Sequence, residues 1–337
     1  MTDEKLARIR ELAERDPFVE LEPAARAVLE EAMSGPALYE GVGTLLGAPL
    51  REDFSELDIA LIGVAFDLGV VHRPGARFGP RAVRNENRIG PYHHVSRILP
   101  FALCEIADVG DAAVGLNFDL DSGIRAIEDY YHRVVDAGVI PVSVGGDHSI
   151  TYPILKALGR DRPVGLVHID AHCDTGPEWG GSKFHHGGPF RNAAVAGVLD
   201  PERTIQIGIR GGAEFIWQFS YDSGMTVLHI EDVHRMGVEA VVAKAREVVG
   251  DGPTYVSFDV DGLDPVYAPG TGTPEVGGLT TAEAQGILRG LQGLDVIGGD
   301  VVEVAPEYDA TSNTALTAAT MLFEITCLIA ERVSKRR

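Results

Sequence analysis

Three short segments of the sequence concentrate side chains that can hold metal ions. They are GGDHS at 145–149, DAHCD at 170–174 and DVDGLDP at 259–265. Each directly follows an apolar run of the kind that forms a buried strand. Because residues two apart in an extended chain project to the same side, Asp170, His172 and Asp174 can converge on one point. Asp259 and Asp261 have the same spacing and can converge in the same way.

Together with His148, these side chains supply four carboxylates and two imidazoles. So many anions at the ends of buried strands would be very costly without cations, and the sequence offers no matching cluster of Arg or Lys. Four carboxylates offset the charge of two divalent ions, and two of them can bridge the pair. The predicted metal ligands are His148, Asp170, His172, Asp174, Asp259 and Asp261.

The types of ligand indicate the kind of metal. Imidazoles and carboxylates without a thiolate favour Mn²⁺, with Ni²⁺, Co²⁺ or Zn²⁺ as alternatives. Cys173 lies between two predicted ligands, but in an extended chain it points to the opposite side, so we interpret it as packing. Either acidic segment alone could be a turn, a helix cap or a fragment of a calcium loop. Their occurrence together at three strand ends favours a two-metal site.

Seven apolar runs predict the β-strands that position these segments. The runs are 58–64, 139–144, 164–169, 204–209, 226–230, 254–258 and 296–302. Helical patterns are found at 80–87, 120–137, 151–158, 238–249, 281–291 and 311–333. Several strands, such as VGLVHI, are apolar throughout, as expected for parallel strands covered on both faces. The order predicts a three-layer α/β/α sandwich around a mostly parallel sheet, with the active site at the carboxyl ends of its strands.

The domain organisation is predicted to be simple. Without an internal repeat or a low-complexity linker, residues 46–337 are expected to form a single catalytic domain. Residues 1–45 are expected to be a helical extension, with two charged helices separated by Pro17 and Pro23. This extension could be an oligomerisation arm, a lid or a plain surface segment.

Composition excludes some partners. A net charge of −21 disfavours nucleic acid and anionic membranes; it would attract a cationic substrate, or serve solubility alone. Three separated cysteines and an N-terminus without an apolar signal region predict a reduced, cytoplasmic protein. The longest apolar segment, Ala315–Ala330, is interrupted by Glu324 and is too short to span a bilayer, so we expect a buried helix.

At the three metal-binding segments the sequence resembles the ureohydrolase superfamily of arginases, agmatinases and guanidinobutyrases. The resemblance extends over roughly residues 40–330. Beyond the metal segments it is carried by FDLGVVHRPGARFGPRAVR at 66–84, HHGGPFRNA at 185–193, TPEVGGLT at 273–280 and VVEVAPEYD at 301–309. The resemblance implies an arginase-like fold, commonly assembled as trimers or hexamers. A homo-oligomer is therefore expected, or a hetero-oligomer with a paralogue.

The resemblance also implies roles for individual residues. Asp170 and Asp259 would bridge the two metals. His148 and Asp174 would complete one site, and His172 and Asp261 would complete the other. Further matches place catalytic residues at His186, the proton-shuttle histidine; Glu303, the guanidinium-binding glutamate; and Asp147, which with Asp264 would orient the ligands.

The implied reaction is hydrolysis of a guanidino compound to urea and an amine. A guanidinium carbon is a poor electrophile, and metal coordination lowers the pKa of water from about 15.7 towards 7. A carboxylate such as Glu303 can hold a planar guanidinium through two parallel hydrogen bonds. General acid–base help of the kind assigned to His186 is typically worth about 10²–10⁴-fold in rate.

Two features depart from the common family pattern and bear on the substrate. His185 precedes His186, and an insert at 176–184 places Trp179 near the expected pocket mouth. Both are candidate substrate-binding residues, although Trp179 could instead pack at a subunit contact. The sequence shows no recognition element for an α-amino acid head group. Agmatine, guanidino acids, guanidine, alkylguanidines and biguanides therefore remain open as substrates.

Two other functions compete with this one. A single-zinc, deacetylase-like amidohydrolase would have a similar fold, but Asp261, His148 and Glu303 favour two metals. A non-catalytic partner subunit would be expected to have lost ligands, and all six are present.

Overall fold

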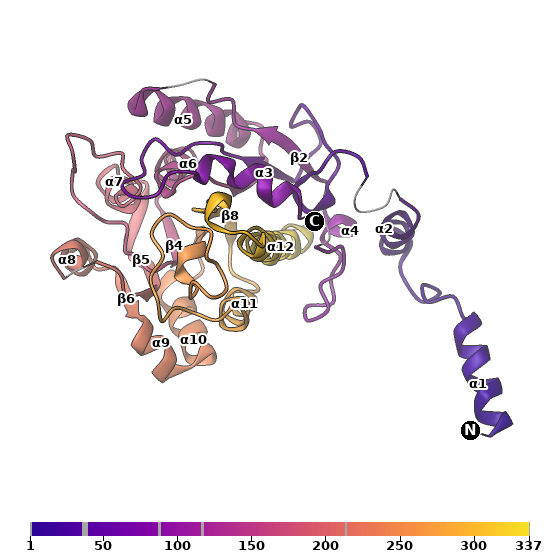
Figure 1. The fold of residues 1–337 in the computed structure, drawn as a ribbon. Coiled ribbons are helices and arrows are strands. Elements are labelled where there is room, and N and C mark those ends of the chain that lie inside the picture. Colours follow the sequence, from indigo (N-terminus) through magenta and orange to yellow (C-terminus); the bar gives the residue numbers. More distant parts are fainter. Residues whose placement is uncertain (1, 36–39, 87–88, 116–117, 213, 337) are drawn as a thin grey trace. The chain divides into compact units, whose positions relative to one another are not determined.

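Eight strands of the described chain form one sheet in the order β2-β1-β3-β8-β7-β4-β5-β6, and all paired strands are parallel. The structure is a computed structural model that describes all residues except 1, 36–39, 87–88, 116–117, 213 and 337 (Figure 1). The strands are β1 Ile59–Gly63, β2 Ile106–Asp111, β3 Ile140–Val144, β4 Val164–Ile169, β5 Leu199–Ile209, β6 Thr226–His229, β7 Thr254–Asp259 and β8 Val296–Val302.

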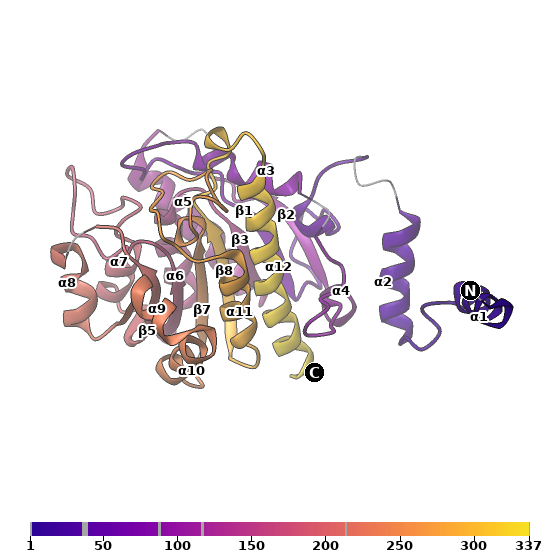
Figure 2. The same ribbon diagram turned by 60° about the horizontal axis from the view of Figure 1, so that its bottom comes forward.

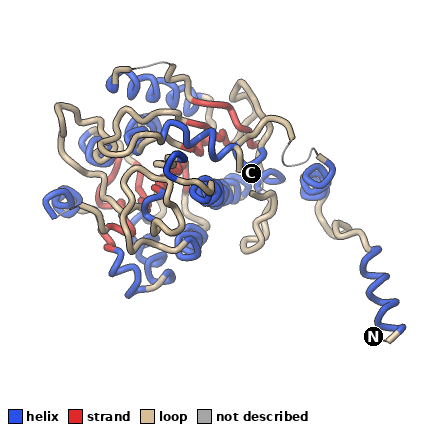
Figure 3. Tube along the Cα trace, in the orientation of Figure 1, coloured by secondary structure: helices blue, strands red, loops and turns tan. Residues whose placement is uncertain are grey.

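Helices flank the sheet and lie around it (Figure 3). The helices of residues 41–337 are α3 Gly79–Arg84, α4 Pro100–Leu103, α5 Leu120–Asp136, α6 Thr151–Leu158, α7 Pro189–Val195, α8 Glu214–Ser223, α9 Ile230–Met236, α10 Val238–Val249, α11 Thr281–Gly290 and α12 Asn313–Ser334. Helices α5, α6 and α7 share one hydrophobic core with one face of the sheet. Helices α9 to α12 share another core with the opposite face (Figure 2). The predicted three-layer sandwich is confirmed.

The central strands are buried on both faces, which explains their unbroken apolar character. Every residue of β1, β4 and β7 is buried. Helix α12 is long and apolar enough to cross a membrane by composition, but 83% of its most apolar window is buried inside the protein. The segment Ala315–Ala330 is thus part of a core helix, as expected.

The described residues fall into two compact units, residues 1–40 and residues 41–337. The first unit contains α1 Asp3–Glu14 and α2 Pro23–Ser34, and neither helix has a buried residue. Helix α1 begins at the Thr2 cap, whose hydroxyl accepts a hydrogen bond from the Lys5 backbone N–H. The role of this unit as an arm, a lid or a surface segment stays a prediction.

Several predicted element boundaries were wrong. The sequence IADVGD forms strand β2 at an edge of the sheet and was not predicted. Its apolar run is interrupted by Asp108, which is buried in an ion pair with Arg84. Ile230 begins α9 and does not end β6, and β5 starts at Leu199. Helices α7 and α9 have seven residues each, which is too short for a helical period to stand out. Helix α3 ends at Arg84, and the predicted end at Asn87 lies outside the described residues.

Candidate metal centre and active site

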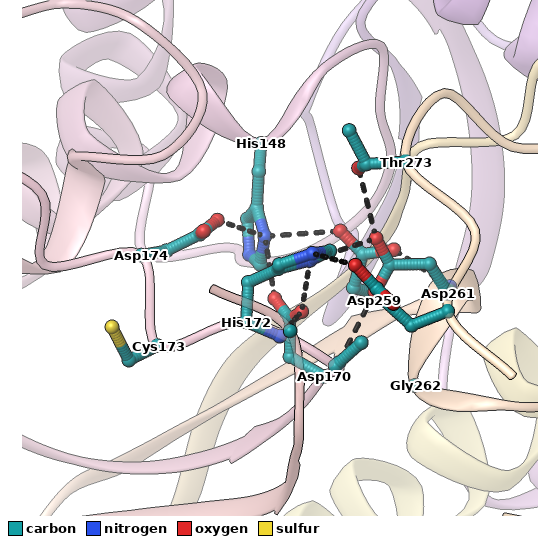
Figure 4. A network of polar contacts seen from close by, with 12 residues as sticks. His148, Asp170, His172, Cys173, Asp174, Asp259, Asp261, Gly262 and Thr273 are labelled. Atoms are coloured by element: carbon teal, nitrogen blue, oxygen red, sulfur yellow. Dashed lines mark hydrogen bonds and ion pairs between the residues drawn. The ribbon is translucent and has the colours of Figure 1, made fainter. Parts of the chain in front are cut away.

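The four central strands β3, β8, β7 and β4 deliver the predicted site residues at their carboxyl ends. The loop after β3 carries Asp147 and His148, and Glu303 follows β8. The segments at the ends of β7 and β4 carry the predicted carboxylate ligands and His172. The structure therefore brings together all six predicted metal ligands, and Figure 4 shows their side chains pointing toward one another.

His148 lies fully buried among three carboxylates. Its Nδ1 is 2.9 Å from Asp174, 3.2 Å from Asp170 and 3.2 Å from Asp259. The other ring nitrogen, Nε2, lies 2.8 Å from the hydroxyl of Ser257. Within the described residues Nδ1 has no hydrogen-bond partner.

The tautomer of His148 follows from the partners of Ser257. The Ser257 hydroxyl donates its one proton to Asp300 at 2.7 Å, so it must accept a proton from His148 Nε2. A neutral His148 then presents the lone pair of Nδ1 to the carboxylates. A lone pair facing buried anions is repulsive unless a cation lies between them, so this arrangement suits a metal ion.

A row of polar side chains runs across the sheet below the cluster. Strand register aligns Ser143, Asp300, Ser257, His168 and Gln206 on five adjacent strands. All five are fully buried. Within the row, Ser257 contacts His148 and His168 contacts Asp170, so these two residues connect it to the predicted ligands.

His168 is a member of this row that the sequence analysis missed. Its Nε2 lies 2.7 Å from Asp170, and its Nδ1 lies 3.2 Å from the side-chain amide of Gln206. The amide nitrogen of Gln206 can only donate, so His168 Nδ1 accepts and His168 Nε2 donates to Asp170. His168 therefore orients a carboxylate and is not itself placed to bind metal.

Removing the hydroxyl of Ser257 tests the role of the polar row. We expect Ser257→Ala to weaken metal binding by about 10–100-fold, the usual effect of removing a partner that orients a ligand. A chelator titration of bound Mn²⁺ measures the change. Ser143→Ala is the matched control, because the Ser143 hydroxyl contacts Tyr131 and no predicted ligand. Equal losses in the two variants would contradict the assigned role.

His172 and Asp261 form a second group beside the first. His172 Nδ1 lies 3.1 Å from Asp261 and 3.5 Å from Asp170. The hydroxyl of Thr273 donates to Asp261 at 3.1 Å (Figure 4). Asp170 thus faces both histidines, as a bridging ligand would. The thiol of Cys173 points away from the cluster (Figure 4).

The pKa values of Asp259 and Asp261 indicate that the cluster needs added positive charge. Burial and the neighbouring charges of Asp261 and Asp170 raise the pKa of Asp259 well above its usual range. Burial raises the pKa of Asp261 to about 6, against the opposing effect of His172. The ionised forms of Asp259 and Asp261 are unfavourable here without added positive charge. The donor set fits a binuclear divalent metal centre.

Arg210, also missed from the sequence, stabilises the loop that carries Asp261. Its guanidinium donates to the backbone carbonyls of Asp261 at 2.8 Å and Leu263 at 3.1 Å, and to that of Glu275 at 2.6 Å. These bonds join the loop after β7 to the 275–276 segment. Arg210 is engaged with backbone oxygens and does not neutralise the carboxylates directly.

Glu303 and His186 contact each other at the edge of the cluster. Glu303 Oε1 accepts from the His148 backbone N–H and from His186 Nδ1, both at 2.8 Å. Glu303 Oε2 is buried and has no partner among the described residues. Glu303 adopts a left-handed backbone with φ 65°, a strained conformation of the kind found at functional sites. Burial lowers the pKa of His186, but the Glu303 charge outweighs this and raises it to about 9.

Asp147 and Asp264 stabilise loops and do not face the cluster centre. Asp147 accepts from the backbone N–H groups of Gly69 at 2.8 Å and Ser149 at 2.9 Å. Asp264 accepts from the Gly277 N–H at 2.7 Å. The close approach at Gly146 requires glycine, because a Cβ there would lie 1.7 Å from the Phe66 carbonyl oxygen.

A cavity of about 450 Å³ opens above the cluster. Its floor includes His186 and four of the predicted ligands, and Trp179, His185 and Phe215 also line it. Trp179 is 65% exposed. His185 is buried, and its Nε2 donates to the Pro177 carbonyl at 2.7 Å. Both predicted substrate-binding residues therefore line the cavity.

Comparison with known proteins decides the family. The family model described as "Arginase family" matches residues 57–328. The chain belongs to the arginase family. The predicted ureohydrolase relationship is confirmed, and with it the class of enzyme, a hydrolase of C–N bonds in linear amidines.

Curated relatives of this arginase-family chain cover most of its length. A guanidinopropionase from Pseudomonas aeruginosa is 51% identical over 301 residues, which are 88% of this chain and 94% of the relative. A mitochondrial agmatinase from Gallus gallus is 45% identical over 86% of each chain. Among solved structures, the proclavaminate amidino hydrolase from Streptomyces clavuligerus superposes with a TM-score of 0.85 at 34% identity, over 88% of this chain and 99% of that one.

Proposed function

We propose that this chain binds two divalent metal ions and hydrolyses a guanidino compound to urea and an amine. The observation that carries the proposal is that His148 Nδ1 lies within 3.2 Å of three buried carboxylates and has no hydrogen-bond partner among the described residues. This arrangement lies beside the unpartnered Oε2 of Glu303. A cation-binding cluster next to a free carboxylate oxygen is what hydrolysis of a cationic guanidinium needs. The named activities of the relatives support the same reaction.

The contacts of the histidines divide the ligands between the two ions, and Asp259 is assigned to both ions by the family pattern. His148, Asp170, Asp174 and Asp259 would hold one ion. Asp170, His172, Asp259 and Asp261 would hold the other. When bound, the ions lower the pKa of water so that it attacks at neutral pH. Mn²⁺ is the first candidate for this donor set, and Ni²⁺ is the alternative.

Glu303 and His186 act on the substrate. Glu303 Oε2 would accept hydrogen bonds from the substrate guanidinium, while Oε1 keeps its bonds to the His148 backbone and to His186. His186 shares a proton with Glu303 through Nδ1. Its other nitrogen, Nε2, accepts a hydrogen bond from the Val71 backbone N–H at 3.3 Å. Once this bond is released and Nε2 is protonated, it can give a proton to the departing amine. Asp147 stabilises the turn that carries His148.

The cellular compartment and the oligomeric state are proposed from the cysteines and from the family pattern. The three cysteines are free and buried, which fits a reducing compartment such as the cytoplasm. A trimer or hexamer is proposed because the family commonly forms them, and assembly with a paralogue is the alternative.

Urea release tests the proposal. Protein stripped of metal and reloaded separately with Mn²⁺ or Ni²⁺ should release urea from at least one of agmatine, guanidinopropionate, guanidinobutyrate, guanidine and alkylguanidines. The stripped protein should release none. If no compound gives urea with either metal, the proposed function is wrong and a non-catalytic partner subunit becomes the better account.

A further inference from the structure

The side chains that line the cavity indicate which substituent the guanidino substrate carries. Among the described residues that line it, none is Lys or Arg, and the acidic residues are Asp174, Glu178, Asp259 and Asp261. Apolar side chains also line it: Val71, Trp179, Phe215 and Ile216. A guanidinium bound at the floor would place its substituent among these side chains.

The Trp179 wall is held in position before any substrate binds. Trp179 and Ser182 exchange two backbone hydrogen bonds of 3.0 and 3.1 Å around Gly180 and Gly181, which have φ of 60° and 84°. Positive φ at both central residues defines the tight hairpin turn that glycine favours. The ring of His185 meets the Trp179 ring edge-on at 6.2 Å. Preorganisation of this wall reduces the entropic cost of binding an apolar group against it.

Helix α8 contributes a second aromatic residue to the cavity lining, Phe215. Phe215 is 80% exposed, so its ring is available to a ligand. Trp217, on the same helix, donates from Nε1 to the Gly211 carbonyl at 3.0 Å. This bond ties the start of α8 to the segment that follows β5.

The cations nearest in sequence to the cavity-lining residues are engaged elsewhere. The Lys183 ammonium lies 5.1 Å from the centre of the Phe184 ring, and the Arg73 guanidinium lies 5.2 Å from that of Tyr308. Arg210 donates to backbone carbonyls. A carboxylate tail entering the cavity would lose hydration without gaining a Lys or Arg partner from these residues, and Glu178 lines the same cavity. That loss is unfavourable.

We infer that the cavity selects a guanidino substrate whose substituent is a small uncharged alkyl group, rather than a guanidino acid. The inference rests on the proposed urea-releasing activity. The inferred substrate differs from the one in the name of the guanidinopropionase that is 51% identical to this chain. An apolar tail gains about fourfold in binding for each methylene it buries, and Trp179 and Phe215 provide the surface.

Three compounds of nearly equal shape test this inference. Propylguanidine, 2-aminoethylguanidine and 3-guanidinopropionate differ only in a terminal methyl, ammonium or carboxylate. With the Mn²⁺-loaded and the Ni²⁺-loaded enzyme, kcat/KM for urea release should be highest for propylguanidine. It should be at least about tenfold lower for 3-guanidinopropionate, because the carboxylate stays unpaired. A higher value for either charged compound would overturn the inference while leaving the proposed function intact. No urea from any of the three or from guanidine would contradict both.

Variants of Trp179 and Phe215 test whether these two residues produce the preference for an alkyl substituent. The ratio to measure is kcat/KM for propylguanidine divided by kcat/KM for guanidine. Trp179→Ala and Phe215→Ala should each lower this ratio by about fourfold or more, which corresponds to the apolar contact of one methylene group. Phe118→Ala is the control, because Phe118 is 88% exposed and does not line the cavity. An unchanged ratio in both wall variants would overturn the inference.

Discussion

Replacing Asp259 by Asn is expected to abolish metal binding and turnover together. Asp259 Oδ2 faces His148 Nδ1, and its Oδ1 accepts from the Asp261 backbone N–H at 2.8 Å. Asn keeps the size of the side chain but removes the charge that would bridge both ions. Metal content per chain should fall to background after loading and desalting, and urea release should fall to the uncatalysed level.

The unfolding temperature distinguishes this outcome from misfolding. Asp259 is buried beside other carboxylates that raise its pKa, so removing its charge relieves repulsion in the metal-free protein. Metal-free Asp259→Asn should therefore unfold at the same or a higher temperature than the metal-free parent. Asp251→Asn, in an exposed turn, is the matched control and should load metal normally. Full metal occupancy in Asp259→Asn would show that this carboxylate is not a ligand.

His186→Ala should retain both metal ions and lose most of the rate. The imidazole contacts Glu303 at 2.8 Å and none of the six predicted ligands directly. Loss of general acid–base help should reduce kcat by about 10²–10⁴-fold. Metal content should match the parent, and added imidazole should restore part of the rate, which a merely structural role would not allow.

His94→Ala is the control for the histidine change, because His94 is exposed and outside the cavity. It should have the parent's kcat. An unchanged kcat in His186→Ala would remove this residue from the mechanism. Loss of metal in the same variant would mean that His186 stabilises the cluster rather than transferring a proton.

The convergence of the ligands could be predicted because parallel strands gather their carboxyl ends at one edge of the sheet. The extended backbone assumed for the alternating residues was wrong, because Asp174 has φ 50° and Asp261 lies in the 3₁₀ turn Val260–Gly262. The order of the strands is not needed for that argument. The apolar strands that carry the ligands were also predictable, because burial on both faces leaves a continuous hydrophobic run.

The polar row beneath the ligands could not be predicted in the same way. His168, Ser257 and Asp300 each interrupt a different apolar strand, and nothing local links them. Their contacts depend on strand order and on register, which pairs His168 with Ser257 and Ser257 with Asp300. Register between parallel strands is set by distant packing, so single polar residues in buried strands were passed over.

Arg210 was missed for a related reason. Its partners are carbonyl groups of two loops that come together only in the folded chain. The edge strand β2 was missed because the buried Asp108 interrupts its apolar run, and the Arg84 partner that makes this possible comes from a distant helix. In each case contacts between residues far apart in the sequence determine the structure, and the local sequence pattern does not predict those contacts.

Anomalous diffraction from a crystal of the Mn²⁺-loaded protein tests the two-metal centre most directly. Two peaks about 3.5–4 Å apart are expected, with Asp170 and Asp259 between them, one peak beside His148 and the other beside His172. A single peak, with Asp261 left unligated, would contradict the two-metal account and favour a one-metal amidohydrolase.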